Sequence, residues 1–256
     1  MRTAAIIPRT GTALRGGART GWAATLAALA LSACEPAAPP PPAPEPIAPE
    51  RLYRDASRSV AMVYAAEASG RIVGRGSGVF LDQELLVTSC HVIARGKTIH
   101  VGHRQKRSPA RLAAYDAERD LCALLAPGLD IAPARIGKAA SVEVGQRVYA
   151  IGAPEGFELT LSEGIVSGLR DSPSGRYLQI TAPLSEGSSG GGLFDSWGRL
   201  IGITAFVYSS GQNLNFAAPV EWAVAVADKA AAARRDAAPV ALPPQYARQW
   251  RPPLLN

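Results

Sequence analysis

Histidine is scarce in this chain, and its placement separates two classes of serine-containing site. The 256 residues hold three histidines, His91, His100 and His103, and all of them precede Ser189. Ser189 is the central residue of Gly187–Gly191, a G-x-S-x-G pattern typical of an activated serine on a glycine-lined turn. An α/β-hydrolase needs its histidine after the serine. That class is therefore excluded, whereas the chain order His…Asp…Ser remains available.

Several other signatures are missing as well. The chain has no glycine fingerprint of a dinucleotide-binding fold and no alternation of strands with helices, so we expect no cofactor and no metal. The short basic cluster His103–Arg107 is more typical of a solvated loop than of a binding patch. Residues 1–33 hold four of the arginines and no acidic residue, so the rest of the chain carries +2 rather than +6. We therefore expect no nucleic-acid partner.

The N-terminus is typical of an export signal. Trp22–Leu31 is apolar but too short to span a bilayer as a mature helix. Leu31–Cys34 follows and resembles the bacterial lipobox, in which the cysteine becomes the diacylated first residue. We thus predict a lipoprotein signal peptide over 1–33 and lipidation of Cys34; cleavage after Ala28–Ala30, in an ordinary exported protein, is the alternative. Glu35 is not the aspartate that resembles an inner-membrane retention signal, so outer-membrane sorting is the default.

The rest of the chain divides by composition. Proline and alanine dominate 34–50, which predicts a semi-rigid extended tether. Short apolar runs separated by Gly, Pro, Asp and Ser fill the body and indicate an all-β barrel or sandwich. One helix is predicted over 219–235, with a proline at its start and an arginine pair at its end. A proline-rich tail is predicted over 236–256.

Five stretches of the body follow one another in the chain: Gly76–Ile93, Arg119–Leu125, Ala150–Gly156, Ala182–Phe194 and Phe216–Pro219. In this order they resemble trypsin-like peptidases of the HtrA (Do) type. The resemblance covers about residues 51–230, the protease domain of that family, and we expect no PDZ domain. Two positions depart from the family pattern, since Ser188 replaces an asparagine and Gly192 replaces a proline.

The resemblance implies a chymotrypsin-like double β-barrel with a C-terminal α-helix. We predict one domain over 51–235, with a first barrel at 51–135, a second barrel at 136–218 and the helix after it. His91 would act as general base, Asp120 would orient it, and Ser189 would be the nucleophile. The N–H groups of Gly187 and Ser189 would form the oxyanion hole. Asp116 and Asp130 are the alternatives for the acidic member.

Three further expectations concern the surroundings of the site. His100 and His103 lie in a polar stretch and are interpreted as surface residues. Cys90 and Cys122 are predicted to form a disulfide, because the contact between His91 and Asp120 would draw them together; two separate buried thiols are the alternative. A specificity pocket is expected from uncharged residues, which favours a small or apolar substrate residue; these are Pro183, Thr204, Ala205, Phe206 and Asn215.

The sequence therefore favours a serine endopeptidase that cleaves exposed or misfolded polypeptides. It would face the bacterial periplasm, held to the membrane by the lipid on Cys34. Two other functions stay open at this point. One is a trypsin-fold binding or chaperone module without activity, and the other is an esterase-like acyl hydrolase. The sequence gives no indication of an oligomeric state.

Overall fold

The computed structural model describes residues 45–156, 159–208, 212–233, 240–246 and 250–255. The predicted signal peptide, Cys34 and nearly all of the predicted tether lie outside these residues. So does the end of the helix predicted to finish at Arg235. Within the described part of the chain, no helix has the length and apolar character needed to cross a membrane.

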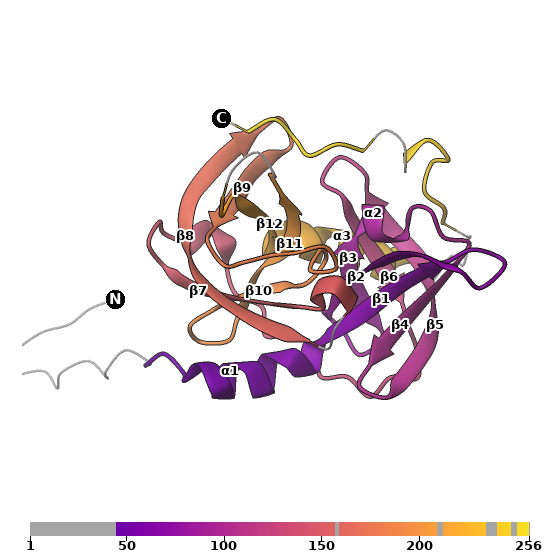
Figure 1. Ribbon diagram of the computed structural model, residues 1–256, viewed down its shortest axis with the longest axis horizontal. Coiled ribbons are helices and arrows are strands. Elements are labelled where there is room, and N and C mark those ends of the chain that lie inside the picture. The colour runs from indigo at the N-terminus through magenta and orange to yellow at the C-terminus, as the bar shows by residue number, and fades with distance from the viewer. Residues whose placement is uncertain (1–44, 157–158, 209–211, 234–239, 247–249, 256) are drawn as a thin grey trace, which may run out of the picture. The chain divides into compact units, whose positions relative to one another are not determined.

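Antiparallel strands close into two six-stranded barrels (Figure 1). The first barrel has the order β1-β2-β3-β6-β5-β4 and the second the order β10-β11-β12-β9-β8-β7. The prediction of an all-β, chymotrypsin-like double barrel is confirmed. The strands are β1 (Val60–Ala66), β2 (Ile72–Phe80), β3 (Leu85–Ser89), β4 (Thr98–His103), β5 (Lys106–Asp116), β6 (Leu121–Leu125), β7 (Arg147–Gly152), β8 (Thr160–Ser172), β9 (Gly175–Ile180), β10 (Gly192–Asp195), β11 (Leu200–Val207) and β12 (Asn215–Pro219).

Helices are few and lie at the margins of the barrels. Helix α1 begins at Pro49, inside the predicted tether, because a proline is favourable in the first turn and Glu50 complements the positive end of the helix dipole. Leu52 on this helix is fully buried. Helix α3 packs against strands of both barrels, including β6 and β11. The helices are α1 (Pro49–Ala56), η1 (Ser57–Ser59), α2 (Cys90–Ile93), η2 (Ala139–Ser141), η3 (Pro154–Gly156) and α3 (Val220–Ala233).

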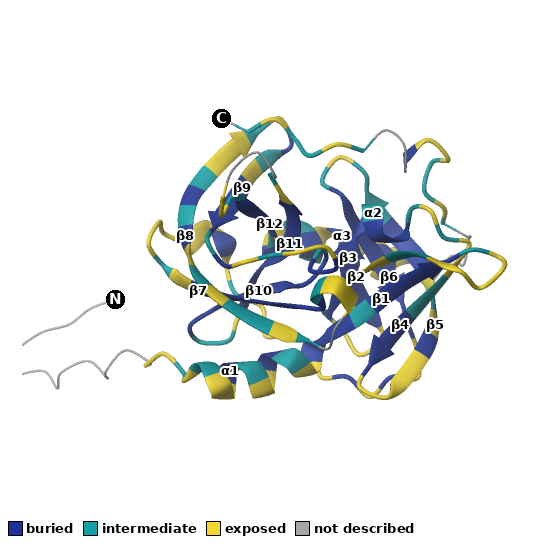
Figure 2. Ribbon diagram, in the orientation of Figure 1, coloured by how far each residue is buried: buried dark blue, intermediate teal, exposed yellow. Residues whose placement is uncertain are grey.

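Buried residues lie along the strands of both barrels (Figure 2), and they form two hydrophobic clusters. One cluster fills the first barrel. The other fills the second barrel, continues between the barrels and includes the inner face of α3. Strand β6 is buried along its whole length, since one of its faces looks into the first barrel while its other face is covered by α3 and the second barrel. This packing holds in place the end of β3 and the start of β6, which are paired with each other.

The polar stretch around His103 forms a hairpin rather than a solvated loop. Strands β4 and β5 pair across Arg104 and Gln105, and Arg104 takes the left-handed conformation with φ of 53°. His103 is buried, and its Nδ1 lies 3.0 Å from the Val60 carbonyl oxygen. Burial lowers the pKa of His103, with the hydrogen bond opposing the shift. The interpretation of His103 as a surface residue is therefore wrong. Its polar neighbours in the sequence gave no sign of the burial, because the group that binds it is 43 positions away. His100 is partly exposed.

Candidate active site

The pairing of β3 with β6 brings His91 and Asp120 together. In the ladder, Ser89 is opposite Leu121, so the residues just after β3 meet those just before β6. His91 lies on the short helix α2, which begins where β3 ends. The Cys90 N–H donates to the Asp120 carbonyl oxygen at 2.9 Å and continues the ladder by one further bond. The contact therefore follows from strand register alone.

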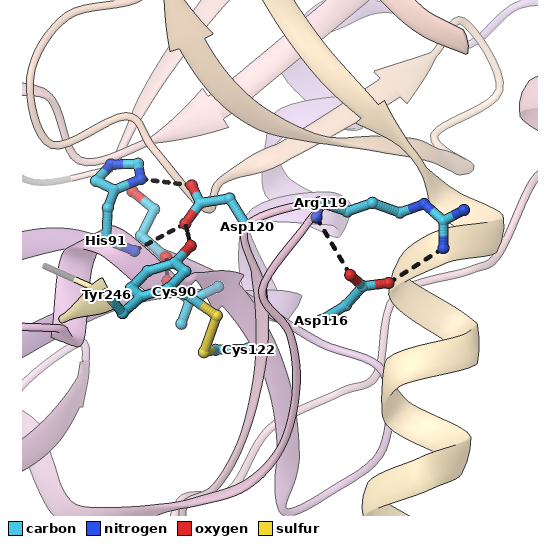
Figure 3. Close-up of a disulfide and its surroundings, with 9 residues drawn as sticks. Cys90, His91, Asp116, Arg119, Asp120, Cys122 and Tyr246 are labelled. Carbon is cyan, nitrogen blue, oxygen red and sulfur yellow. Dashed lines mark hydrogen bonds and ion pairs between the residues drawn. A yellow bond between two sulfur atoms is a disulfide. The ribbon is translucent and has the colours of Figure 1, made fainter. Parts of the chain in front are cut away.

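The Asp120 carboxylate holds His91 at two points (Figure 3). Its Oδ2 lies 2.5 Å from Nδ1 of the imidazole, and its Oδ1 accepts the backbone N–H of His91 at 2.9 Å. Asp120 is 3% exposed and takes the left-handed conformation with φ of 58°, which aspartate tolerates better than most residues. A buried carboxylate with these two donors fixes both the orientation and the tautomer of the ring. In the neutral ring, the other nitrogen, Nε2, then carries no proton and can accept one.

The other two candidate aspartates lie elsewhere. Asp116 forms an ion pair with Arg119, with 3.1 Å between Oδ2 and Nη1, and also accepts the Arg119 N–H (Figure 3). Asp130 is exposed beyond the end of β6. Of the three aspartates, Asp120 is the one placed against His91.

The turn that carries Ser189 depends on a glycine at position 187. Gly187 has φ of +93°, in the region that side chains rarely adopt. A Cβ there would lie 2.4 Å from the Ala153 carbonyl oxygen, closer than any atoms can pack. The N–H groups of Gly187 and Ser189 have no hydrogen-bond acceptor among the described residues, whereas Ser188 between them donates to Ser185 at 3.0 Å. Two donors are therefore left available at this turn.

Ser77 of β2 fastens this turn to the first barrel. Its fully buried hydroxyl donates to the Gly187 carbonyl oxygen and accepts the Ala153 N–H, both at 2.8 Å. Its backbone N–H donates to the Ser189 carbonyl oxygen at 2.8 Å. Thr204 of β11 holds the other side, since its hydroxyl donates to the Ser188 carbonyl oxygen at 2.6 Å. No signal in the sequence pointed to this role of Ser77, although Ser77 lies in Gly76–Ile93, one of the stretches that carried the resemblance.

Ser189 and His91 line one cavity of about 320 Å³, to which Gly187 and Glu186 also contribute. The Ser189 hydroxyl donates to the Ala205 carbonyl oxygen at 3.2 Å. A hydroxyl has one proton, so in this rotamer Ser189 does not donate to the His91 ring. The structure thus gathers the three predicted residues and leaves the serine turned toward β11.

Comparison with known proteins agrees with this geometry. A family model described as a trypsin-like peptidase domain matches residues 76–203. The chain belongs to the trypsin-like peptidase family.

Proteases of the Do and HtrA type are among its relatives and structural neighbours, in agreement with the resemblance seen in the sequence. "Protease Do-like 1, chloroplastic" of Arabidopsis thaliana is 34% identical over 171 residues, 61% of this chain and 39% of that protein. A "Probable periplasmic serine endoprotease DegP-like" of Pseudomonas fluorescens is 34% identical over 163 residues, 60% of this chain and 34% of that protein. The chain thus spans between a third and two fifths of these two relatives.

Solved structures share this fold, the following two among them. The serine endoprotease from Yersinia pestis superposes with a TM-score of 0.65 at 28% identity, over 73% of this chain and 68% of that one. The HtrA-type protease AlgW with a tripeptide superposes with a TM-score of 0.64 at 30% identity, over 69% of this chain and 61% of that one.

The five residues expected around a specificity pocket fall into two groups. Pro183 and Thr204 border a cavity of about 200 Å³ whose lining residues are all uncharged. Ala205, Phe206 and Asn215 are buried in the second barrel instead. The Asn215 amide donates to the Ala182 carbonyl oxygen at 3.0 Å, and Phe206 stacks against Phe216 with 5.1 Å between ring centroids. The side chains of Ala205, Phe206 and Asn215 therefore pack behind the cavity and do not line it.

A disulfide joins Cys90 to Cys122 directly beneath the His91–Asp120 pair (Figure 3). Both cysteines are fully buried, and Cys122 is opposite Thr88 in the β3–β6 ladder. The covalent bond therefore links the helix that carries His91 to the strand that follows Asp120.

We expect the double substitution Cys90→Ala with Cys122→Ala to lower the free energy of unfolding by roughly 3 to 4 kcal/mol. The bond closes a loop across 32 positions, and its loss restores conformational entropy to the unfolded chain. Urea denaturation of the wild type and of the variant measures the difference. A reducing agent should lower the stability of the wild type and leave the variant unchanged; equal stabilities of the two proteins would contradict the expectation.

The C-terminal segment reaches this site, which the sequence analysis did not foresee. Tyr246 donates its hydroxyl to Oδ1 of Asp120 at 2.6 Å. Trp250 stacks on the His91 ring, with 4.8 Å between centroids and 24° between planes, and lines the same cavity. Burial first, and then the nearby charge of Asp120 and the hydrogen bond to it, raise the pKa of Tyr246 far above its ordinary value. Tyr246 therefore stays a hydrogen-bond donor.

Proposed function

We propose that the protein is a serine endopeptidase in which Ser189, His91 and Asp120 form the catalytic triad. The observation that carries the proposal is the double hold of Asp120 on His91, with Ser189 in the same cavity. A serine hydroxyl is a poor nucleophile at neutral pH and needs a base whose free nitrogen faces it. The carboxylate at Nδ1 leaves Nε2 to take that part.

In the reaction, the Ser189 hydroxyl turns from the Ala205 carbonyl toward the His91 ring when a substrate is bound. Its oxygen attacks the peptide carbonyl carbon while its proton passes to Nε2 of His91. The tetrahedral intermediate then collapses, the C–N bond breaks, and His91 gives the proton to the leaving amine. Water then attacks the acyl-enzyme and gives a proton to His91. The ester bond to Ser189 breaks, His91 returns the proton to Ser189, and the acid is released. Asp120 remains a carboxylate and stabilises the imidazolium each time.

The unpaired N–H groups of Gly187 and Ser189 support an oxyanion hole. They belong to one tight turn whose carbonyl groups are tied to Ser77 and Thr204, so the donors are fixed before substrate arrives. Donors that need no reorganisation stabilise the developing negative charge most effectively. The uncharged cavity beside Pro183 and Thr204 favours a small or apolar residue next to the cleaved bond.

Labelling with a fluorophosphonate tests this function. An active peptidase forms a covalent adduct, which mass spectrometry of tryptic peptides should place on Ser189. Casein should be degraded faster than short-chain nitrophenyl esters are hydrolysed at comparable enzyme concentration. Ester hydrolysis without casein degradation would indicate an acyl hydrolase, and the absence of both activities together with the absence of labelling would indicate a binding module.

We also propose that the peptidase acts in the bacterial periplasm, tethered by lipid on Cys34. Relatives described as periplasmic endoproteases support export, and the lipobox-like Leu31–Cys34 with the proline-rich tether supports anchoring. Misfolded or exposed polypeptides are then the accessible substrates.

Replacing Cys34 with serine should release the protein from the membrane fraction or leave its signal peptide uncleaved. Two acyl chains give stable anchoring, and the variant has no thiol to carry the diacyl group. Fractionation followed by mass spectrometry of the N-terminal peptide measures both results. Wild-type protein that is wholly soluble, with an N-terminus other than Cys34, would contradict the anchor.

A further inference from the structure

The described residues of the C-terminal segment, 240–246 and 250–255, lie over the proposed active site, the first group on the side of the first barrel and the second group toward the second barrel (Figure 1). Val240 and Leu242 pack against the core of the first barrel, and Leu255 packs against the core of the second. The Tyr208 hydroxyl donates to the Pro253 carbonyl oxygen and fixes the far end of the segment. The segment is therefore docked on both sides of the cavity that holds His91 and Ser189.

Tyr246 is the most deeply buried of the described residues in this segment. It is 7% exposed and belongs to the hydrophobic core of the first barrel. Its backbone carbonyl accepts the Trp250 N–H at 3.0 Å, so the position of Tyr246 is coupled to the ring that stacks on His91. Its hydroxyl donates to Asp120 Oδ1 at 2.6 Å across 126 positions of the chain.

We propose that Tyr246 is a positioning residue of the triad, acting on His91 through Asp120. The inference rests on the proposed function. Oδ1 of Asp120 accepts the His91 N–H on one side and the Tyr246 hydroxyl on the other, which leaves Oδ2 to face Nδ1 of the ring. Loss of the hydroxyl would leave the carboxylate freer to rotate and with more of its negative charge available to His91.

The other charged and titratable groups around this pair are distinct from Tyr246. The Asp116–Arg119 ion pair and Tyr177 lie on the side of β6 and β9, and burial raises the pKa of Tyr177 to about 12. The cavity side is lined by further charged side chains, namely Arg75, Arg95, Glu186 and Arg251. A substitution at Tyr246 leaves all of these side chains in place. A changed pH dependence in such a variant therefore reports the loss of the Tyr246 hydroxyl.

The variant Tyr246→Phe tests the proposal because it removes one oxygen and keeps the buried ring. We expect kcat for a peptide substrate to fall about tenfold, with KM changed by less than about twofold. The acid limb of the pH–rate profile should move a few tenths of a pH unit upward, since a carboxylate with fewer donors retains the imidazolium longer. Steady-state kinetics across pH measures both.

Two matched variants separate positioning from general stabilisation. Tyr53→Phe removes a hydroxyl that donates to the Leu159 carbonyl oxygen at 2.6 Å, on α1 and outside the active-site cavity. Tyr208→Phe removes the other side-chain anchor of the C-terminal segment without contacting Asp120. We expect both to lower the melting temperature and neither to move the acid limb. A Tyr246→Phe variant with an unchanged acid limb and unchanged kcat, and a lower melting temperature, would overturn the proposal.

A second readout does not depend on catalysis. The chain has three histidines, so the ring signals of His91 can be assigned in ¹H–¹⁵N NMR spectra. The pH at which these signals have changed halfway should be higher in Tyr246→Phe than in wild type, and unchanged in Tyr53→Phe. An inactive and unlabelled wild type would refute the proposed function, while the same titration would still decide the role of Tyr246. Identical midpoints in all three proteins would refute that role.

Discussion

Replacing Ser189 with alanine should lower kcat for a peptide substrate roughly 10⁶-fold and leave the fold intact. The substitution removes the attacking oxygen, while the turn that carries it is held by Gly187, Ser77 and Thr204 through backbone groups that alanine retains. His91→Ala should be about as damaging, because the members of a triad act as a unit. Single-turnover kinetics with purified protein measures the loss.

His100→Ala is the matched control for the histidine substitution. His100 lies on β4, partly exposed, where its backbone pairs with the neighbouring strands. Its loss should change kcat by less than about twofold, and circular dichroism should show that all the variants remain folded. The triad assignment is wrong if Ser189→Ala keeps more than one hundredth of the wild-type activity.

The fold and the central geometry of the site could be predicted because their signals are local. Short strands with turn residues indicated the barrels. His91 and Asp120 stand at strand boundaries and Ser189 on a glycine-lined turn, and all three lie inside stretches that resemble one family in order. The register of the β3–β6 ladder then brings His91 and Asp120 together, because Ser89 pairs with Leu121.

The surroundings of the site could not be predicted, because they rest on contacts between residues far apart in the sequence. Tyr246 and Trp250 lie in a proline-rich segment without periodicity, which gives no sign of where it docks. Pro49 lies in a stretch rich in proline and alanine, and its composition masked the start of α1. His103 was interpreted from its polar neighbours, whereas the Val60 carbonyl that holds it becomes a neighbour through folding alone.

Replacing Asp120 with asparagine should lower kcat about 10⁴-fold, although the two side chains have nearly the same shape. In wild type, Oδ1 accepts two donors, the His91 N–H at 2.9 Å and the Tyr246 hydroxyl at 2.6 Å. The asparagine oxygen must occupy that place, because an NH₂ group there would face two donors. Its NH₂ group then faces Nδ1 of His91, which must become an acceptor. The ring proton moves to Nε2, and His91 can no longer take the proton of Ser189.

The matched control is Asp116→Asn, which makes the same chemical change four positions earlier. Asp116 binds Arg119 rather than His91, so its loss should change kcat by less than about threefold and lower stability slightly. NMR signals of the His91 ring should show the changed tautomer in Asp120→Asn and the wild-type tautomer in Asp116→Asn. Equal losses of activity in the two variants would mean that nearby negative charge, rather than the orientation of the imidazole, is what Asp120 supplies. The two donors already on Oδ1 favour orientation, because they leave the carboxylate one way to face the ring.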